Sequence, residues 1–103
     1  MDDITKKVEK YIQNQEYKKA IEVLTEEIKQ NKDVAELYVL RGDVYHIQQE
    51  FSKALNDYRK VLKWKPESKI ISSKIEMIKE ILKFQALDIY SSTNLNKDPW
   101  LDD

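Results

Sequence analysis

Residues 35–66, AELYVLRGDVYHIQQEFSKALNDYRKVLKWKP, give the clearest structural signal in the sequence. This stretch contains Gly42, the only glycine of the chain, inside a pattern typical of a helix. Because glycine costs a helix roughly 1 kcal/mol relative to alanine, its position indicates that a second helix packs closely there. Ala54 is the expected small residue on that second helix, and Pro66 blocks its continuation, since proline lacks an amide hydrogen. The stretch therefore predicts two helices packed as a hairpin.

The same stretch resembles the tetratricopeptide repeat (TPR), a helical unit of about 34 residues. An aromatic, a large residue before glycine, a tyrosine, an alanine between two aromatics and a closing proline stand at the spacings of that motif. These residues are Tyr38, Arg41, Gly42, Tyr45, Phe51, Ala54, Tyr58 and Pro66. The alternative is an ordinary helical hairpin whose spacings match by accident. The resemblance implies an all-α fold built from stacked pairs of antiparallel helices.

The chain before this stretch repeats it without gaps at a shift of 34 residues. The shift aligns Tyr11 with Tyr45, Tyr17 with Phe51, Ala20 with Ala54, and Ile28 with Leu62. Residues 1–34 are therefore expected to form a first TPR unit, and residues 35–68 a second. The first unit is degenerate, because it has Ile4, Val8, Leu24 and Lys32 where the second has Tyr38, Gly42, Tyr58 and Pro66. The expected helices cover about 3–14, 17–31, 34 or 35 to 48, and 51–64, with Asp2 or Asp3 and then Asp33 as N-caps.

Residues 69–90 predict a longer helix that caps the solenoid, begins after an N-cap at Ser68 and runs to about Leu87. Its apolar residues fall into two rows. The row of Ile71, Ile75, Ile78, Leu82 and Ile89 is expected to face the preceding helix, and the row of Ile70, Met77, Ile81 and Phe84 to point into the concave face. The side that would contact a following helix is polar, so the solenoid is expected to end here. The fold class is thus an all-α solenoid of antiparallel helix pairs, with two TPR units and five helices.

Residues 91–103, SSTNLNKDPWLDD, lose the helical periodicity and are expected to form a non-helical tail. Leu95, Trp100 and Leu101 would each cost roughly 1.5–3 kcal/mol if left in water. The tail is either a frayed terminus, or a segment that covers the exposed apolar row in its own chain or in a partner's, or one that a partner protein reads.

Composition excludes several classes of protein. A chain of 103 residues, 41% hydrophobic and 36% charged, is expected to be one small domain with a modest core. Its net charge of −1 argues against a nucleic-acid partner, because affinity for nucleic acid comes mainly from neutralised phosphates. It has no apolar run of the roughly 20 residues that cross a bilayer, so no membrane span is expected. The charged first residues and the lack of cysteine favour a cytoplasmic location.

The sequence offers little chemistry. His46 is the only histidine, and without a second imidazole or a thiolate no metal site is expected. Asp43 lies one turn from His46 and could form an acid–base pair with it, yet a solvated helical surface is the better interpretation. No phosphate-binding loop, nucleophile elbow or zinc motif occurs. We therefore expect no catalysis, no cofactor and no metal.

The TPR resemblance implies a protein–protein interaction scaffold that binds a peptide or helix on its concave face. The candidate binding residues are Glu9, Ile12, Val39, Asp43, His46, Ile47, Ile70, Met77, Ile81 and Phe84. Acids at Glu9, Glu36 and Asp43 would favour a ligand with apolar anchors and some positive charge. A TPR subclass that grips chaperone carboxylates needs several basic groove residues, and only Lys74 stands at such a position here. The alternative function is a self-associating homodimer that uses the apolar row of the last helix and the tail.

Overall fold

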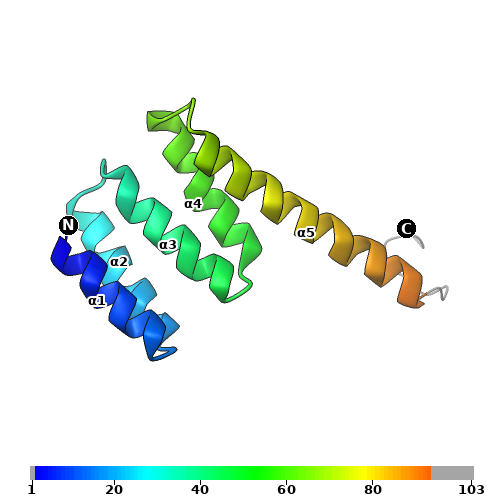
Figure 1. The fold of residues 1–103 in the computed structure, drawn as a ribbon, viewed down its shortest axis with the longest axis horizontal. Helices are drawn as coiled ribbons and strands as arrows, with labels where there is room; N and C mark the ends of the chain where they lie inside the picture. Colours follow the sequence, from blue (N-terminus) through cyan, green and yellow to red (C-terminus); the bar gives the residue numbers. More distant parts are fainter. Residues whose placement is uncertain (1, 94–103) are drawn as a thin grey trace.

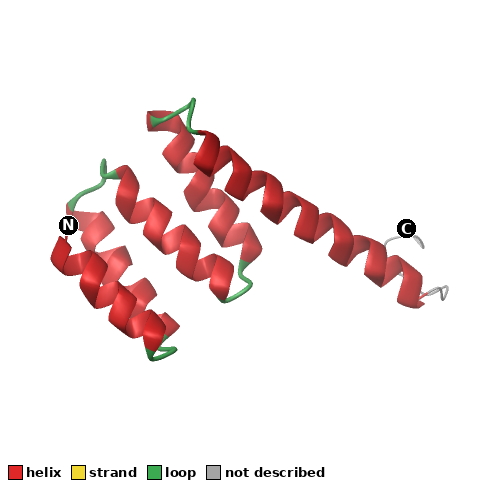
Figure 2. Ribbon diagram, in the orientation of Figure 1, coloured by secondary structure: helices red, strands yellow, loops and turns green. Residues whose placement is uncertain are grey.

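The chain folds into consecutive α-helices joined by short turns. The computed structural model describes residues 2–93, with side chains described for residues 3–86. Within that range it contains α1 (Asp2–Gln13), α2 (Tyr17–Gln30), α3 (Ala35–Ile47), α4 (Phe51–Trp64) and α5 (Lys69–Thr93), and no strand (Figures 1 and 2). The predicted all-α fold with five helices is confirmed.

The helices form two layers. In Figure 1, α1, α3 and α5 lie in front of the fainter α2 and α4. Each helix packs on its neighbour in the sequence, most extensively α3 on α4. The buried core between the layers is made of Val8, Ala20, Leu24, Ile28, Ala35, Leu37, Tyr38, Val44, Phe51, Ala54, Leu55, Tyr58, Val61, Ile71, Ile75 and Ile78. This arrangement of alternating front and back helices is that of a helical repeat.

The backbone itself repeats every 34 residues. Gln15 and Gln49, at equivalent positions after α1 and α3, adopt left-handed φ values of 59° and 62°. The next amide in each case bonds back to the helix, Glu16 N to Tyr11 O at 2.7 Å and Glu50 N to Tyr45 O at 2.8 Å. This six-residue closure ends a helix and turns the chain sharply. The register seen in the sequence is thus present in the turns of both helix pairs.

The predicted helix starts were right at one cap and wrong at two. Ile71 N donates to Ser68 Oγ at 3.2 Å, so the serine cap of α5 is confirmed. The N-cap of α3 is Val34, which has no side-chain cap, and not Asp33. Since Leu37 N bonds to Val34 O at 3.1 Å, Asp33 lies one position outside the helix and cannot cap it. Asp2 and Asp3 lie inside α1.

Helix α5 is longer than expected. It ends at Thr93, so the predicted end near Leu87 and the predicted start of the tail at Ser91 are both wrong. The reason is that no glycine or proline interrupts residues 69–93, and α5 continues straight through Lys83, the position equivalent to Gln15 and Gln49. With 25 residues against 14 in α4, α5 projects well beyond the other helices (Figure 1). Residues 94–103, including Leu95, Trp100 and Leu101, lie outside the described residues.

Gly42 marks a close approach between α3 and α4, but its partner differs from the prediction. A Cβ atom on Gly42 would lie 2.8 Å from Cε1 of Tyr58, with two more atoms of that ring at 3.1 and 3.2 Å. The three nearest atoms all belong to Tyr58, so the aromatic ring and not Ala54 takes the space of the missing side chain. Ala54 is fully buried nearby in the core.

Candidate partner-binding face

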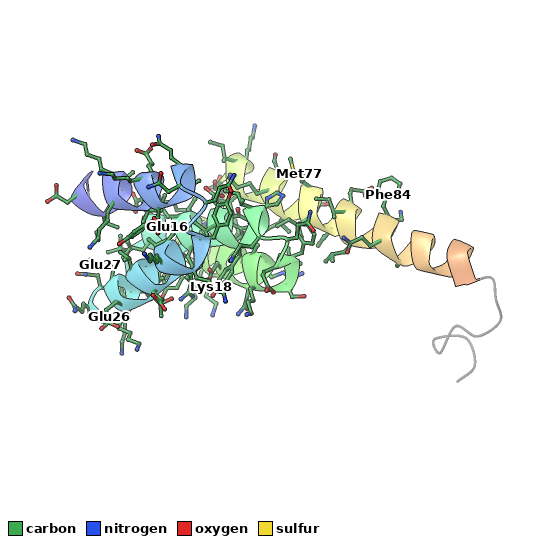
Figure 3. All side chains as sticks on the ribbon, turned by 90° about the horizontal axis from the view of Figure 1, so that it is seen from below. Glu16, Lys18, Glu26, Glu27, Met77 and Phe84 are labelled. Carbon is green, nitrogen blue, oxygen red and sulfur yellow. The ribbon has the colours of Figure 1, made fainter. Side chains whose placement is uncertain are left out.

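The candidate site is the surface of α1, α3 and α5 that is turned away from α2 and α4. We call it the inner face and define it by Glu9, Ile12, Val39, Asp43, His46, Ile47, Ile70, Met77, Ile81 and Phe84. Figure 3 shows Met77 and Phe84 on α5 pointing to the side opposite α2 and α4. Four large apolar side chains of this face are exposed: Ile47 (47%), Ile70 (71%), Met77 (54%) and Phe84 (65%). Among the described side chains only one other large hydrophobic, Trp64, is exposed.

The other members of the inner face are less accessible. Ile12, Val39 and Ile81 are half-buried and pack against the core, while Glu9 is exposed. On α5 the two predicted rows are distinct, because Ile71, Ile75 and Ile78 are buried whereas Ile70, Met77 and Phe84 are not. The accessible apolar surface is therefore concentrated on α5 and at the end of α3.

A polar cluster at Asp43, which is itself part of the inner face, joins three helices. The Tyr58 hydroxyl from α4 donates a hydrogen bond to Asp43 Oδ1 on α3. Lys74 Nζ from α5 donates to the same oxygen at 3.0 Å. Burial of the phenol, and then its bond to Asp43, raise the pKa of Tyr58. The cluster fixes α5 against α3, two helices that have few other contacts with each other.

This cluster changes two expectations from the sequence. Asp43 is neutralised within the fold by Lys74, so it is not a free acid that would attract a positive ligand. Lys74 is engaged in the same ion pair, so it is not available to grip a carboxylate. The inner face therefore presents more apolar surface and less unpaired negative charge than the sequence suggested.

His46 has a packing role. Its ring lies edge-on to Phe51, with 5.7 Å between the ring centroids. The partners of Asp43 are Tyr58 and Lys74, and no hydrogen bond between Asp43 and His46 occurs among the described side chains. Over residues 3–86, no group of three metal-ligating side chains comes together. No helix between residues 2 and 93 is both long and apolar enough to cross a membrane.

Sequence reasoning missed a buried ion pair that supports this face. Arg41 binds Asp57 with two parallel bonds, Nε to Oδ2 at 2.9 Å and Nη2 to Oδ1 at 2.8 Å. Its Nη1 also donates to Thr25 Oγ1 on α2 at 3.2 Å, so one guanidinium joins α2, α3 and α4. The hydrogen bond to Asp57 raises the pKa of Arg41. One feature of the sequence does indicate this ion pair. Asp57 is an acid on the side of α4 that is otherwise apolar and buried, and in the structure its side chain is only 3% exposed.

Residues 35–68 match the sequence model of the family described as tetratricopeptide repeat. That range covers α3, α4 and the turn that follows them. Residues 35–68 are therefore similar to a tetratricopeptide repeat, and the five helices of residues 2–93 fit a helical repeat of this type. No curated protein and no solved structure matches the chain.

Proposed function

We propose that this protein is a non-catalytic interaction scaffold whose inner face binds a peptide or helix of another protein. The observation that carries the proposal is the distribution of exposed apolar side chains. Four of the five large ones in the described range lie on α3 and α5, which belong to the same layer. Exposed apolar side chains that gather on one face mark interaction sites more often than scattered ones do.

The surface also predicts the chemistry of the ligand. Ile47, Met77 and Phe84 present aliphatic, thioether and aromatic groups with few fixed polar partners. Methionine adapts to varied apolar shapes, so a ligand with two or three apolar anchors suits this face. Since Asp43 is already paired with Lys74, exposed Glu9 is the acid of this face that a positive group on the ligand would meet.

Peptides selected from a random displayed library would test this proposal. Their affinity is measured for the wild type, for Met77→Glu, and for Trp64→Glu as a matched control at an exposed apolar residue off the inner face. We expect Met77→Glu to weaken binding by more than about tenfold, because a carboxylate is costly to bury without a partner. Equal weakening by Trp64→Glu, or the absence of any enriched peptide, would contradict the proposal.

Self-association is the second candidate, and the spacing of the α5 row favours it. Ile70, Met77 and Phe84 lie seven residues apart on a helix that projects from the body. A seven-residue apolar repeat is what two helices need in order to pack along a seam. Light scattering over a concentration series would show a dimer whose formation Met77→Glu abolishes. If the protein is a monomer at every concentration, self-association is excluded and peptide binding remains the proposed function.

The tail is a third possible occupant, and we propose it as a built-in ligand for the α5 row. From Thr93 the segment 94–103 can reach roughly 33 Å when extended. Phe84 lies only about 14 Å back along α5, and Met77 about 24 Å. The tail is therefore long enough to reach the apolar row of α5. Because α5 is longer than expected, however, the tail begins far from α1 and α3.

We further propose that residues 1–34 form a degenerate TPR unit and that α5 is a capping helix. The first proposal is supported by the turns at Gln15 and Gln49, which share one backbone geometry. The second is supported by the exposed polar side of α5, where Glu76 and Lys79 pair with each other at 3.5 Å. The cytoplasmic location stays a prediction.

A further inference from the structure

The outer side of α4 carries charge of one sign only. Its exposed charged residues are Lys53, Arg59, Lys60 and Lys63, and its only acid, Asp57, is buried against Arg41. These cations and Asn56 make up what we call the basic stripe. It runs over about 15 Å of helix, given a rise of about 1.5 Å per residue. None of the ion pairs among the described side chains involves a cation of the stripe.

The other helices do not share this property. On α2 two exposed lysines are paired with acids, Lys19 with Glu16 at 2.9 Å and Lys29 with Glu26 at 3.8 Å. On α5 Lys79 is likewise paired with Glu76. Figure 3 shows Lys18 toward one end of α2 and Glu26 and Glu27 toward the other, so this helix carries side chains of both signs. The unbalanced charge of α4 is therefore a local feature and does not follow from the overall composition.

The basic stripe also borders a shallow hollow and an exposed apolar side chain. Asn56, Arg59, Lys60 and Lys63 line a shallow hollow of about 210 Å³. Beside it, Trp64 is 38% exposed and packs on Tyr38 with 5.5 Å between ring centroids. Lys60 Nζ lies 5.3 Å from the centroid of the same tyrosine ring, which holds the cation next to the tryptophan. Arginine and tryptophan are the side chains most often found at the energetic centre of protein interfaces.

We propose that the basic stripe is a second docking surface, which binds an acidic segment of a partner protein. The segment would place carboxylates along about three helical turns and an apolar side chain against Trp64. Charge complementarity of this kind raises association rates and selects the partner, while Trp64 supplies the apolar contact. The stripe lies on the layer opposite the inner face, so one scaffold could hold two proteins at once.

Nucleic acid is the other polyanion to consider, and the surroundings argue against it. A nucleic-acid site needs a basic surface that follows the backbone for many phosphates. Here the neighbouring back-layer helix, α2, exposes Glu22 and Glu26, and the chain carries a net charge of −1. A second copy of the chain is also a poor fit, because the acids exposed on its α2, Glu22 and Glu26, lie among exposed lysines of the same helix, and Glu26 is paired with Lys29 at 3.8 Å. A short acidic protein segment avoids both conflicts.

The test uses a labelled helical peptide with glutamates at positions i, i+4, i+7 and i+11, and the same peptide with glutamines instead. Fluorescence anisotropy measures binding to the full chain, to a triple variant with Arg59→Gln, Lys60→Gln and Lys63→Gln, and to a matched control. The control changes three exposed lysines of α1 to glutamine, Lys6, Lys7 and Lys10, and so alters the net charge equally. Urea denaturation checks that all variants fold.

We expect the glutamate peptide to bind the wild type. The α4 variant should bind this peptide about tenfold more weakly, because it loses three exposed ion pairs with the peptide. The α1 variant keeps those ion pairs, so its affinity should change by less than about twofold. Met77→Ala should leave this binding unchanged, which separates the stripe from the inner face. Equal losses in both triple variants, equal binding of the glutamine peptide, or no binding at all would overturn the proposal. Tighter binding of a single-stranded oligonucleotide of the same charge, lost in the α4 variant, would assign the stripe to nucleic acid instead.

Discussion

Substitution of Gly42 gives a sharp test of how α3 and α4 pack. A methyl group at this position would lie 2.8 Å from Cε1 of Tyr58, whereas nonbonded carbons rest about 3.5–4.0 Å apart. The ring cannot move aside easily, because it is fully buried and its hydroxyl is bound to Asp43. Overpacking of this kind costs about 1–3 kcal/mol, and the helical preference of alanine over glycine returns about 1 kcal/mol. Gly42→Ala is therefore expected to lower the free energy of unfolding by about 1 kcal/mol, and Gly42→Val by more.

The first helix pair supplies the compensating change. At the positions equivalent to Gly42 and Tyr58 it has Val8 and Leu24, which are 1% and 0% exposed. A larger residue on the front helix is thus accommodated there by a smaller one on the back helix. Gly42→Val combined with Tyr58→Leu should accordingly be more stable than the sum of the two single changes by at least about 1 kcal/mol, since residues in contact are not additive.

The assay is urea denaturation followed by circular dichroism at 222 nm for the single and double variants. Lys53→Ala, on the exposed side of α4, serves as a control and should stay within about 0.5 kcal/mol of the wild type. Two results would contradict a close contact between Gly42 and the ring of Tyr58. One is a Gly42→Ala variant stabilised by the amount that helix propensity alone predicts, and the other is strict additivity in the double variant.

Three further predictions concern the polar groups and the tail. Arg41→Leu leaves Asp57 buried without its partner, so it should lower the free energy of unfolding, measured by urea denaturation, by about 3–5 kcal/mol. Adding Asp57→Leu should recover part of that loss. A double variant no more stable than the single one would speak against a buried ion pair. The pKa of Tyr58 is raised in the folded protein, so its stabilising effect is present below pH about 10 and is lost as the pH rises through the pKa of the folded state. Absorbance at 295 nm should therefore show one tyrosine that ionises only when the protein unfolds at alkaline pH. Tyr58→Phe should remove this signal. Removal of residues 94–103 should increase dye binding, and Trp100 emission in the full chain should be blue-shifted; emission like that of indole in water together with an inert truncation would mean that the tail covers nothing.

The sequence predicted the parts of this fold that depend on periodicity. The two rows of α5 are an example, because helical spacing alone separates Ile71, Ile75 and Ile78 from Ile70 and Met77, and burial in the structure follows that separation. The 34-residue register is another, since it reappears in the turns.

Features that depend on contacts between helices could not be predicted in the same way. Residue size predicts Ala54 as the partner of Gly42, yet the ring of Tyr58, on the same helix as Ala54, takes the space. Likewise, spacing placed Asp43 beside His46, whereas its carboxylate turns toward groups on α4 and α5. Pairings of this kind are set by the relative placement of helices, which no local pattern encodes.

Amide chemical-shift mapping tests whether the inner face binds a partner. A peptide selected on the wild-type protein is titrated into the ¹⁵N-labelled chain, and the shifts are followed along all helices. We predict that the largest changes fall at Ile47, Met77 and Phe84 and that the changes on α2 stay small. Shifts centred on α2 and α4, with α3 and α5 unchanged at saturation, would contradict the claim.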